Sequence, residues 1–255
     1  MKNEPLLIAF CSQKGGIGKS TFTILAASYL HYVLGKKVAV VDCDYPQYSI
    51  YKMREREKEK VGQIDFYKRL AYVQFQQGGK KAYPVLDSTP EGAIGYYNEY
   101  VEEYGEDYEI ILFDLPGTVN TDGVLSCISV LDYIFIPVIA DRLVLASSLS
   151  FASFIQESFV RQAKHSLKGV YLFWNRVDLR EKTDLYEKYE KVFTKFELPL
   201  LGTRIPDTKR FNKDITDTKM GLFRSTLFPP DSRLLRGSNL NILMEEICEL
   251  IKIQD

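Results

Sequence analysis

Continuous apolar runs recur along the chain, and stretches with helical periodicity separate most of them. Five runs rich in β-branched and aromatic residues occupy residues 6–11, 38–41, 110–113, 134–139 and 170–174, and two weaker candidates lie at 83–86 and 200–205. Hydrophobicity that is continuous rather than alternating is typical of strands buried on both faces. The pattern predicts an α/β fold with a doubly wound, mostly parallel sheet flanked by helices, which binds ligands at the carboxyl ends of its strands.

One stretch departs from this rhythm, at residues 53–109. It begins with the mixed-charge run REREKEK at 54–60, which indicates a solvated helix face, and its QQGGKK at 76–81 indicates an exposed loop. The chain has 255 residues, of which 45% are hydrophobic, so it can bury a full core. We therefore expect a single domain over residues 1–255 with a less regular helical and loop region at about 53–109.

A glycine-rich turn, QKGGIGKST at residues 13–21, follows the first predicted strand. A strand that ends in such a turn and opens a helix directs backbone N–H groups and the positive end of the helix dipole at one point, which suits a polyphosphate. Lys19 is expected to reach the terminal phosphates, and the Ser20 hydroxyl to bind the Mg²⁺ that bridges them. The expected nucleotide contacts in this turn are Lys14, Gly15, Gly16, Ile17, Gly18, Lys19, Ser20 and Thr21.

Carboxylates end two other predicted strands. Asp114 directly follows the apolar residues 110–113, as in a Walker B site, and is predicted to hold Mg²⁺ through water together with Ser20. Asp42 and Asp44 lie at the mouth of the second strand, in DCDYPQ at residues 42–47, where they point toward the phosphates. In the segment LPGT at 115–118, Gly117 gives a backbone free to move toward a γ-phosphate, as in nucleotide-dependent switches.

The phosphate-binding turn departs from the ordinary P-loop pattern, because Gln13 replaces its first glycine and a second lysine, Lys14, follows. The sequence KGGIGKST resembles the deviant P-loop of the ParA/MinD family, ATPases that position plasmids, chromosomes and division machinery. The resemblance implies an ATP-dependent homodimer in which Lys14 reaches the partner subunit's nucleotide. It also implies that Asp44 positions or activates the attacking water, so that Lys14, Lys19 and Asp44 are catalytic, and that Asp42 supports the magnesium shell.

The same resemblance assigns the base-binding residues. Asn175 matches the family's base-recognition asparagine, and Pro206 and Asp207 match the loop that closes the other side of the base. The tetrapeptide NRVD at 175–178 also resembles the N-K-x-D motif of guanine-specific GTPases, with an arginine in place of the lysine. The P-loop and switch segments together favour ATP over GTP, so the expected cofactors are ATP and Mg²⁺.

Composition narrows the location and the partners. The formal net charge is −1, so nucleic acid or anionic membrane could be bound only by a local patch. The four cysteines have no metal or redox spacing, and His31 and His165 are expected to be structural. No apolar stretch approaches the roughly 20 residues of a spanning helix. We therefore expect a cytoplasmic protein without a membrane anchor.

Two features of the C-terminal half bear on the choice among family activities. Residues 239–255 are amphipathic but acidic, so they are expected to dock on the sheet rather than on a membrane, as the basic end of division-site ATPases does. Between positions 209 and 236, seven basic residues stand against three acidic ones, and in a dimer they could follow a DNA phosphate backbone. The basic residues are Lys209, Arg210, Lys213, Lys219, Arg224, Arg233 and Arg236.

The sequence thus predicts a ParA-like ATPase that acts as an ATP-dependent dimerisation switch in the partitioning or positioning of a plasmid, chromosome or conjugative element. The expected partners are non-specific DNA and a ParB-like adaptor that stimulates weak hydrolysis. The alternative is a metabolic ATP-dependent ligase or transferase of the same superfamily, such as a dethiobiotin-synthetase-like enzyme.

Overall fold

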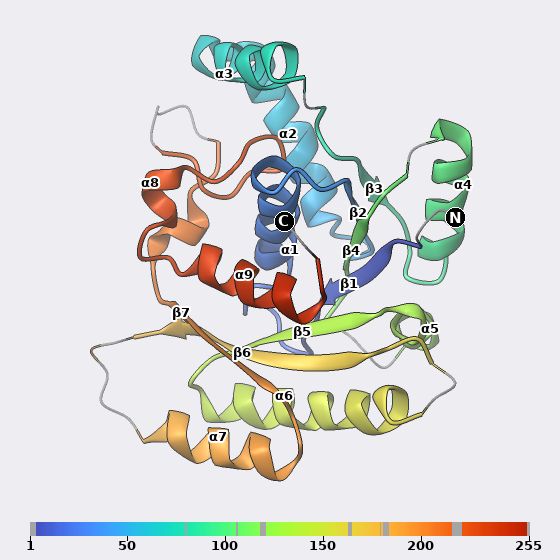
Figure 1. The fold of residues 1–255 in the computed structure, drawn as a ribbon, viewed down its shortest axis with the longest axis vertical. Helices are drawn as coiled ribbons and strands as arrows, with labels where there is room; N and C mark the ends of the chain where they lie inside the picture. The colour runs from blue at the N-terminus through green and yellow to red at the C-terminus, as the bar shows by residue number, and fades with distance from the viewer. Residues whose placement is uncertain are drawn as a thin grey trace.

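A parallel β-sheet forms the centre of the molecule (Figure 1). The computed structural model describes residues 4–79, 81–105, 107–117, 121–162, 165–178, 180, 184–215 and 221–253. Over these residues the sheet has seven strands in the order β3-β2-β4-β1-β5-β6-β7, all parallel. The strands are β1 (Leu6–Phe10), β2 (Val38–Asp42), β3 (Val85–Asp87), β4 (Ile110–Asp114), β5 (Tyr133–Val138), β6 (Gly169–Val177) and β7 (Leu200–Pro206). Both weaker strand candidates are thus confirmed.

Helices cover both faces of the sheet, as a doubly wound fold requires (Figure 1). One face packs against α1 (Lys19–Ser28), α2 (Ser49–Gln63) and α9 (Leu240–Leu250). The other packs against α4 (Ala93–Tyr104), α5 (Asp122–Val130), α6 (Arg142–Ile155) and α7 (Leu185–Lys195). The shorter helices are η1 (Tyr29–Val33), α3 (Asp65–Ala71), η2 (Tyr72–Gln77), η3 (Gln156–Val160), η4 (Lys209–Asn212) and α8 (Ser232–Leu235).

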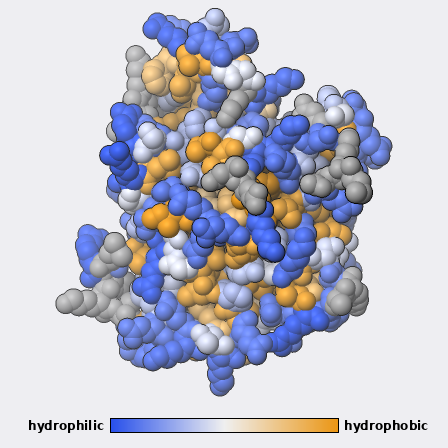
Figure 2. Space-filling view, in the orientation of Figure 1, coloured by the Kyte–Doolittle hydropathy of each residue, from blue (hydrophilic) through white to orange (hydrophobic). Residues whose placement is uncertain are grey.

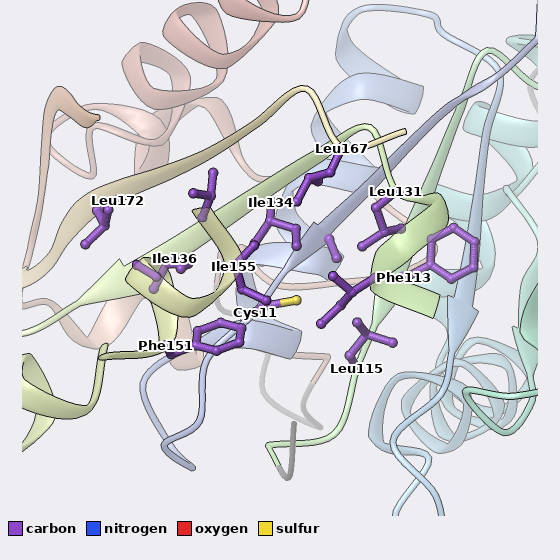
Figure 3. Packing of buried hydrophobic residues seen from close by; sticks show 14 of the residues in the cluster. Cys11, Phe113, Leu115, Leu131, Ile134, Ile136, Phe151, Ile155, Leu167 and Leu172 are labelled. Carbon is purple, nitrogen blue, oxygen red and sulfur yellow. The ribbon is translucent and has the colours of Figure 1, made fainter. Parts of the chain in front are cut away.

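The alternation of side chains along each strand explains why the sequence shows continuous hydrophobicity. In β1, Ile8 and Phe10 belong to the core on the α1 side, whereas Ala9 belongs to the core on the α6 side. Figure 3 shows part of this second core, where Phe151 and Ile155 of α6 lie beside Cys11. Both sets of positions must be apolar because both faces are covered.

The region at 53–109 contains the end of α2, then α3, η2, β3 and α4, so it is more regular than its sequence suggests. Its mixed-charge run is not a fully solvated face, and that expectation was wrong: Arg54 and Glu57 are only 5% and 3% exposed. Both side chains bind Thr226 of the C-terminal segment. Residues 76–79 and 81 are exposed as predicted, and Lys80 lies outside the described residues.

The C-terminal helix docks on the sheet as its acidic amphipathic sequence predicts. Leu243 and Ile247 of α9 are buried, and the carboxylate of Glu246 accepts the backbone N–H groups of Gly202 and Thr203 in β7. Hydrophilic residues cover most of the face seen in Figure 2, with apolar residues in patches between them, one of them beneath α3 at the top of the view.

One helical stretch, residues 142–160 over α6 and η3, is long and apolar enough to cross a membrane by length and composition. The expectation that no apolar stretch approaches this length was therefore wrong. The reason is structural: α6 lies on the sheet, and its side chains Leu145, Phe151 and Ile155 are buried in the core beside β5. A helix that packs on a covered sheet needs the same residue types as a spanning helix.

The cysteines and His31 have structural roles in the fold, as expected from the sequence. Cys11, Cys43, Cys127 and Cys248 are all buried and free, as small core residues would be. Both ring nitrogens of His31 lie 2.9 Å from backbone carbonyl oxygens, those of Lys36 and Lys81, so this side chain ties two loops together.

Candidate nucleotide-binding site

The glycine-rich turn lies between the central strand β1 and the start of α1, where its backbone can face a phosphate chain. Gly18 has a φ of 110°, and a Cβ there would approach the Phe22 ring to 3.1 Å and Asn175 Nδ2 to 3.2 Å. Glycine is therefore required by both conformation and space. The first helical hydrogen bond runs from Phe22 N to Gly18 O over 2.8 Å, so α1 opens directly at the turn.

A cavity of about 720 Å³ lies over this turn and defines the phosphate side of the site. Of the predicted residues, Gly15, Gly16, Gly18, Lys19, Ser20, Thr21 and Asp44 line it. Gly117 also lines it and lies close to Lys19, because a Cβ on Gly117 would be 3.4 Å from Lys19 Nζ. Thr118 of the same predicted switch segment lies outside the described residues.

Lys14 behaves differently from Lys19. Its side chain is exposed, and among the described residues that line the phosphate-side cavity Lys14 does not appear, although both its neighbours, Gln13 and Gly15, do. Its backbone N–H donates to Ser12 Oγ at 3.1 Å, which holds the main chain at this position. Of the two P-loop lysines, Lys19 lines the phosphate-side cavity, whereas Lys14 is exposed and does not line it.

Asp114 is a buried carboxylate without a hydrogen-bond partner. It ends β4, is fully buried, and neither of its oxygens accepts a hydrogen bond from a described group. Burial raises its pKa to about 7, with the neighbouring Asp42 and Asp44 adding to the rise, while the nearby Ser20 hydroxyl and Lys19 oppose it. An uncompensated buried carboxylate beside Ser20 fits a divalent cation at this position.

Asp42 has a different environment, although it pairs with Asp114 in the register of β2 and β4. Its Oδ2 accepts the backbone N–H groups of Ile50 and Tyr51 at 2.8 and 2.9 Å, and its Oδ1 accepts Asp44 N at 3.2 Å. Asp42 thereby accepts hydrogen bonds from backbone N–H groups in the first turn of α2, which have no acceptor within the helix. Because its oxygens are already engaged, the geometry favours Asp114 over Asp42 as the carboxylate for magnesium.

The side chains around Ser20 would provide only part of the ligands of a metal ion. Such a partial set suits Mg²⁺ that is bound together with a nucleotide. The described residues contain no group of three or more His, Cys, Asp or Glu side chains that could hold a metal. Mg²⁺ commonly keeps several waters and takes only one or two protein ligands plus the phosphates of a nucleotide. Ser20, with Ser49 Oγ 3.4 Å from its hydroxyl, and the unpartnered Asp114 would provide that incomplete set.

Asp44 lies two residues beyond the end of β2 and is partly buried at the cavity. Burial raises its pKa, and the Lys19 ammonium opposes that rise. Its carboxylate therefore interacts electrostatically with Lys19, and both residues line the phosphate-side cavity.

A second cavity, of about 350 Å³, adjoins the first and brings together the residues predicted to bind the base. Asn175, Pro206 and Asp207 all line it, with Phe22 and Phe211. Strand β6 continues to Val177, so Asn175 lies inside the strand rather than after it. Its Nδ2 donates to Ile17 O at 2.8 Å, which joins the base side of the site to the P-loop.

Arg176 is a site residue that the sequence did not single out. It lines both cavities, has a φ of 53°, and its guanidinium donates to Gly16 O. The aspartate of the guanine-like tetrapeptide is directed elsewhere: Asp178 accepts from Arg180 Nε and Nη2, both at 3.0 Å, and Asp178 does not line the base cavity. Asp178 is therefore not placed to read a guanine amino group as the aspartate of an N-K-x-D motif does, and the carboxylate that lines this cavity is that of Asp207.

The predicted basic patch is divided among several environments. Arg224 lines the phosphate-side cavity instead of an outer surface, which corrects its grouping with the others. Arg210 donates to Leu234 O at 3.5 Å, and Arg233 is paired with Asp231. Lys219 lies outside the described residues. Nothing in the sequence marks Arg224 as a site residue, because it lies 203 positions from the P-loop threonine that it contacts.

Comparison with known protein families identifies the nucleotide-binding family to which the P-loop resemblance points. The sequence profile of the CobQ/CobB/MinD/ParA nucleotide binding domain matches residues 8–219. Among curated proteins, no match is found by sequence.

Solved structures with the same fold include MinD of Aquifex aeolicus in its complex with MinC (16% identity, 98% of this chain and 97% of that chain covered, TM-score 0.61). A putative plasmid partition protein of Borrelia burgdorferi bound to AMPPNP is similar over 98% and 100% of the two chains (19% identity, TM-score 0.58). Cobyrinic acid a,c-diamide synthase of Mycobacterium smegmatis, with bound ADP and magnesium, is similar over 81% and 88% (18% identity, TM-score 0.53). Because this profile matches most of its length, the chain belongs to the CobQ/CobB/MinD/ParA nucleotide-binding family.

Proposed function

We propose that this protein is an ATP-dependent dimerisation switch that positions DNA cargo such as a plasmid, chromosome or conjugative element. The observation that carries the proposal is the separation of the two P-loop lysines, with Lys19 in the cavity and Lys14 exposed outside it. An exposed ammonium group on the phosphate-binding loop, outside the lining of its own cavity, is suited to the triphosphate of a second subunit. Closure of two subunits over ATP would then depend on Lys14.

In this proposal each side chain of the site has a defined task. Lys19 neutralises the terminal phosphates, Ser20 and Asp114 hold Mg²⁺, and Mg²⁺ offsets the charge that develops on the transferred phosphoryl group. Asp44 positions or activates the attacking water beside Lys19. Asn175, Pro206 and Asp207 hold adenine in the cavity that Phe22 and Phe211 also line.

The proposed cycle also has partners. Hydrolysis is slow in the isolated protein and is stimulated by a ParB-like adaptor, which resets the dimer to monomers in the cytoplasm. The C-terminal helix supports this assignment over a division-site role, since it is acidic and lies on the sheet.

The test is the oligomeric state by light scattering, with ADP and with a non-hydrolysable ATP analogue. We expect a dimer only with the ATP analogue, and only monomer for Lys14→Ala under every condition. Lys191→Ala, on an exposed position of α7, is the matched control and should dimerise like wild type. A dimer in Lys14→Ala would refute the proposed role of this lysine.

The second candidate function is a metabolic ATP-dependent ligase or transferase, which the similarity to cobyrinic acid a,c-diamide synthase favours. Such an enzyme needs no dimer closed by Lys14 and hydrolyses ATP productively only with a small acceptor. A wild-type protein that stays monomeric with the ATP analogue, and whose hydrolysis a carboxylate-containing metabolite increases, would establish this alternative.

A further inference from the structure

Arg224 reaches the P-loop from a distant part of the chain. Its Nη1 donates to Thr21 Oγ1 at 2.9 Å, while Nε and Nη2 donate to Asp214 Oδ1 and Oδ2 at 2.8 and 3.0 Å. Its side chain is 23% exposed, and the residue lines the phosphate-side cavity together with Lys19 and Ser20. The role proposed above for the site leaves this cation without a task.

The backbone around Arg224 is held on both sides. The neighbouring residues Phe223 and Ser225 are fully buried, and the N–H groups of Phe223 and Arg224 both donate to Lys213 O at 2.9 Å. Two residues further on, Thr226 is bound by Arg54 and Glu57 of α2. The guanidinium is therefore presented in one orientation, which lowers the entropy cost of using it to bind a ligand.

The hydrogen bonds that Arg224 makes do not use all its donors. A guanidinium carries five N–H groups, and three of them are accounted for by the bonds to Asp214 and Thr21. Over the described residues this leaves one N–H on each of Nη1 and Nη2, and two N–H groups of an arginine can bind a phosphate in a bidentate contact. Asp214 fixes the plane of the group and still leaves this pair for a ligand.

The position of Thr21 indicates which phosphate Arg224 would contact. Thr21 lines both the base-side cavity and the phosphate-side cavity, whereas Lys19, Asp44 and Gly117 line only the latter. Arg224 lines only the phosphate-side cavity, and Thr21, to which it is bonded, lies where that cavity adjoins the base-side cavity. This arrangement favours the phosphate nearest the nucleoside as the one that Arg224 would contact.

We propose that Arg224 is a nucleotide-binding residue, acting within its own chain on the phosphate nearest the nucleoside, with Asp214 as the residue that positions it. The inference rests on the proposed function, because it needs a nucleotide in this site. It assigns Arg224 a contact that ADP and ATP share, in contrast to Lys14 and Asp44, which act at the terminal phosphate.

The test compares Arg224→Met with wild type by calorimetric titration of ADP with Mg²⁺ and of a non-hydrolysable ATP analogue with Mg²⁺. Loss of a charge-assisted bidentate contact should lower the affinity for both ligands by a similar factor, about tenfold.

The matched control is Arg233→Met. Arg233 makes the same fork with Asp231, with Nε–Oδ1 3.0 Å and Nη2–Oδ2 2.6 Å, but its side chain is 83% exposed and lines neither nucleotide cavity. Its affinities should stay within about twofold of wild type.

Each result of these titrations either supports or overturns the assignment of Arg224 as a nucleotide-binding residue. Unchanged ADP affinity in a folded Arg224→Met protein would overturn the inference, as would a loss confined to the ATP analogue, since that would place the contact at the terminal phosphate. If the methionine variant does not fold, Arg224→Gln is judged by the same criterion, because it keeps a donor for Asp214. A wild-type protein that binds neither nucleotide would instead overturn the proposed function, and this inference with it.

Discussion

Asp114 is the clearest example of a single side chain whose environment points to a missing counter-charge. A fully buried carboxylate with two unpartnered oxygens is costly for a folded protein unless a cation or donor completes it. Asp42, one strand away, shows the contrast, because backbone N–H groups already satisfy it. Over the described residues, the same residue type in adjacent strands thus has hydrogen-bond partners in one case and none in the other.

Replacing Asp114 with Asn should weaken Mg²⁺ binding by roughly 10- to 100-fold, the range found when a residue that orients metal ligands is removed. The reason is that the neutral amide offers no charge to the cation or to its waters. Titration of Mg²⁺ into the ADP complex measures the effect. Asp178→Asn is the control, since Asp178 pairs with Arg180 outside both cavities, and equal Mg²⁺ affinities in the two variants would refute the assignment of Asp114.

Gly18→Ala should cost about 1–2 kcal/mol of folding free energy, because an L-residue is strained at a φ of 110° and the new Cβ would press on Phe22 and Asn175. Asn175 would move away from its bond to Ile17, so nucleotide affinity should fall as well. Chemical denaturation and nucleotide titration measure the two effects. Gly15→Ala is the stability control, since a Cβ there meets nothing within 4 Å; a comparable loss of stability in both would contradict this account.

Helix α2 connects the nucleotide site to the C-terminal segment. Its first turn is bound to Asp42, and one turn later Arg54 donates to Thr226 Oγ1 at 2.7 Å while Glu57 accepts Thr226 N at 2.8 Å. Thr226 lies two residues from Arg224, so the first turn and the middle of this helix each contact a segment that lines the phosphate-side cavity. A polar cluster of this kind specifies one arrangement of α2 because each partner left alone would be a buried unpaired group.

The buried Glu57 should make stability depend on pH. Burial raises its pKa above the ordinary value, so the folded state binds this proton more tightly than the unfolded state. The free energy of unfolding of wild type should therefore fall as pH rises above about 4.5, and Glu57→Gln should lack this part of the fall. Urea unfolding from pH 5 to pH 8 measures the slopes. Glu55→Gln, an exposed neighbour on α2, should keep the wild-type slope; identical slopes in all three proteins would refute the prediction.

The elements themselves were largely predictable, and the exceptions have physical causes. Buried parallel strands appear as apolar runs, so all seven were located, and the P-loop spacing placed α1. The charges of α2 were misjudged because Arg54 and Glu57 are satisfied by Thr226, 172 and 169 positions away. Arg176 and Arg224 were missed as site residues for a related reason. Their contacts with Gly16 and Thr21 join segments that lie far apart in the sequence, so no local sequence pattern predicts them.

At the scale of the complete fold, the sheet order explains how one site draws on so much of the chain. The central strand β1 carries the P-loop, its neighbour β4 carries Asp114, β2 leads to Asp44, and β6 carries Asn175. Parallel strands end at the same edge, so these groups converge there. Of the two predicted phosphate-binding lysines, Lys19 lines the cavity at that edge and Lys14 does not, which is the observation on which the proposed dimer depends.

The DNA hypothesis depends on a smaller surface than the sequence suggested. Arg224 is committed to the nucleotide cavity, so the cations left for DNA among the described residues of the patch include Arg233 and Arg236, near the exposed helix α8. A dimer would present each of them twice. With a net charge of −1, the molecule has no overall attraction for DNA, so binding must come from such a local surface.

The double variant Arg233→Glu/Arg236→Glu should therefore weaken binding of the ATP-bound dimer to duplexes of every sequence by tenfold or more at low salt, and reduce the dependence on salt concentration, which scales with the phosphates neutralised. Fluorescence anisotropy with unrelated duplexes measures both. Lys191→Glu/Lys195→Glu on α7 changes the net charge by the same amount on the other face of the sheet. If that control weakens DNA equally, the effect is one of total charge and the α8 surface is not the contact; if neither variant matters, DNA is not bound through these cations.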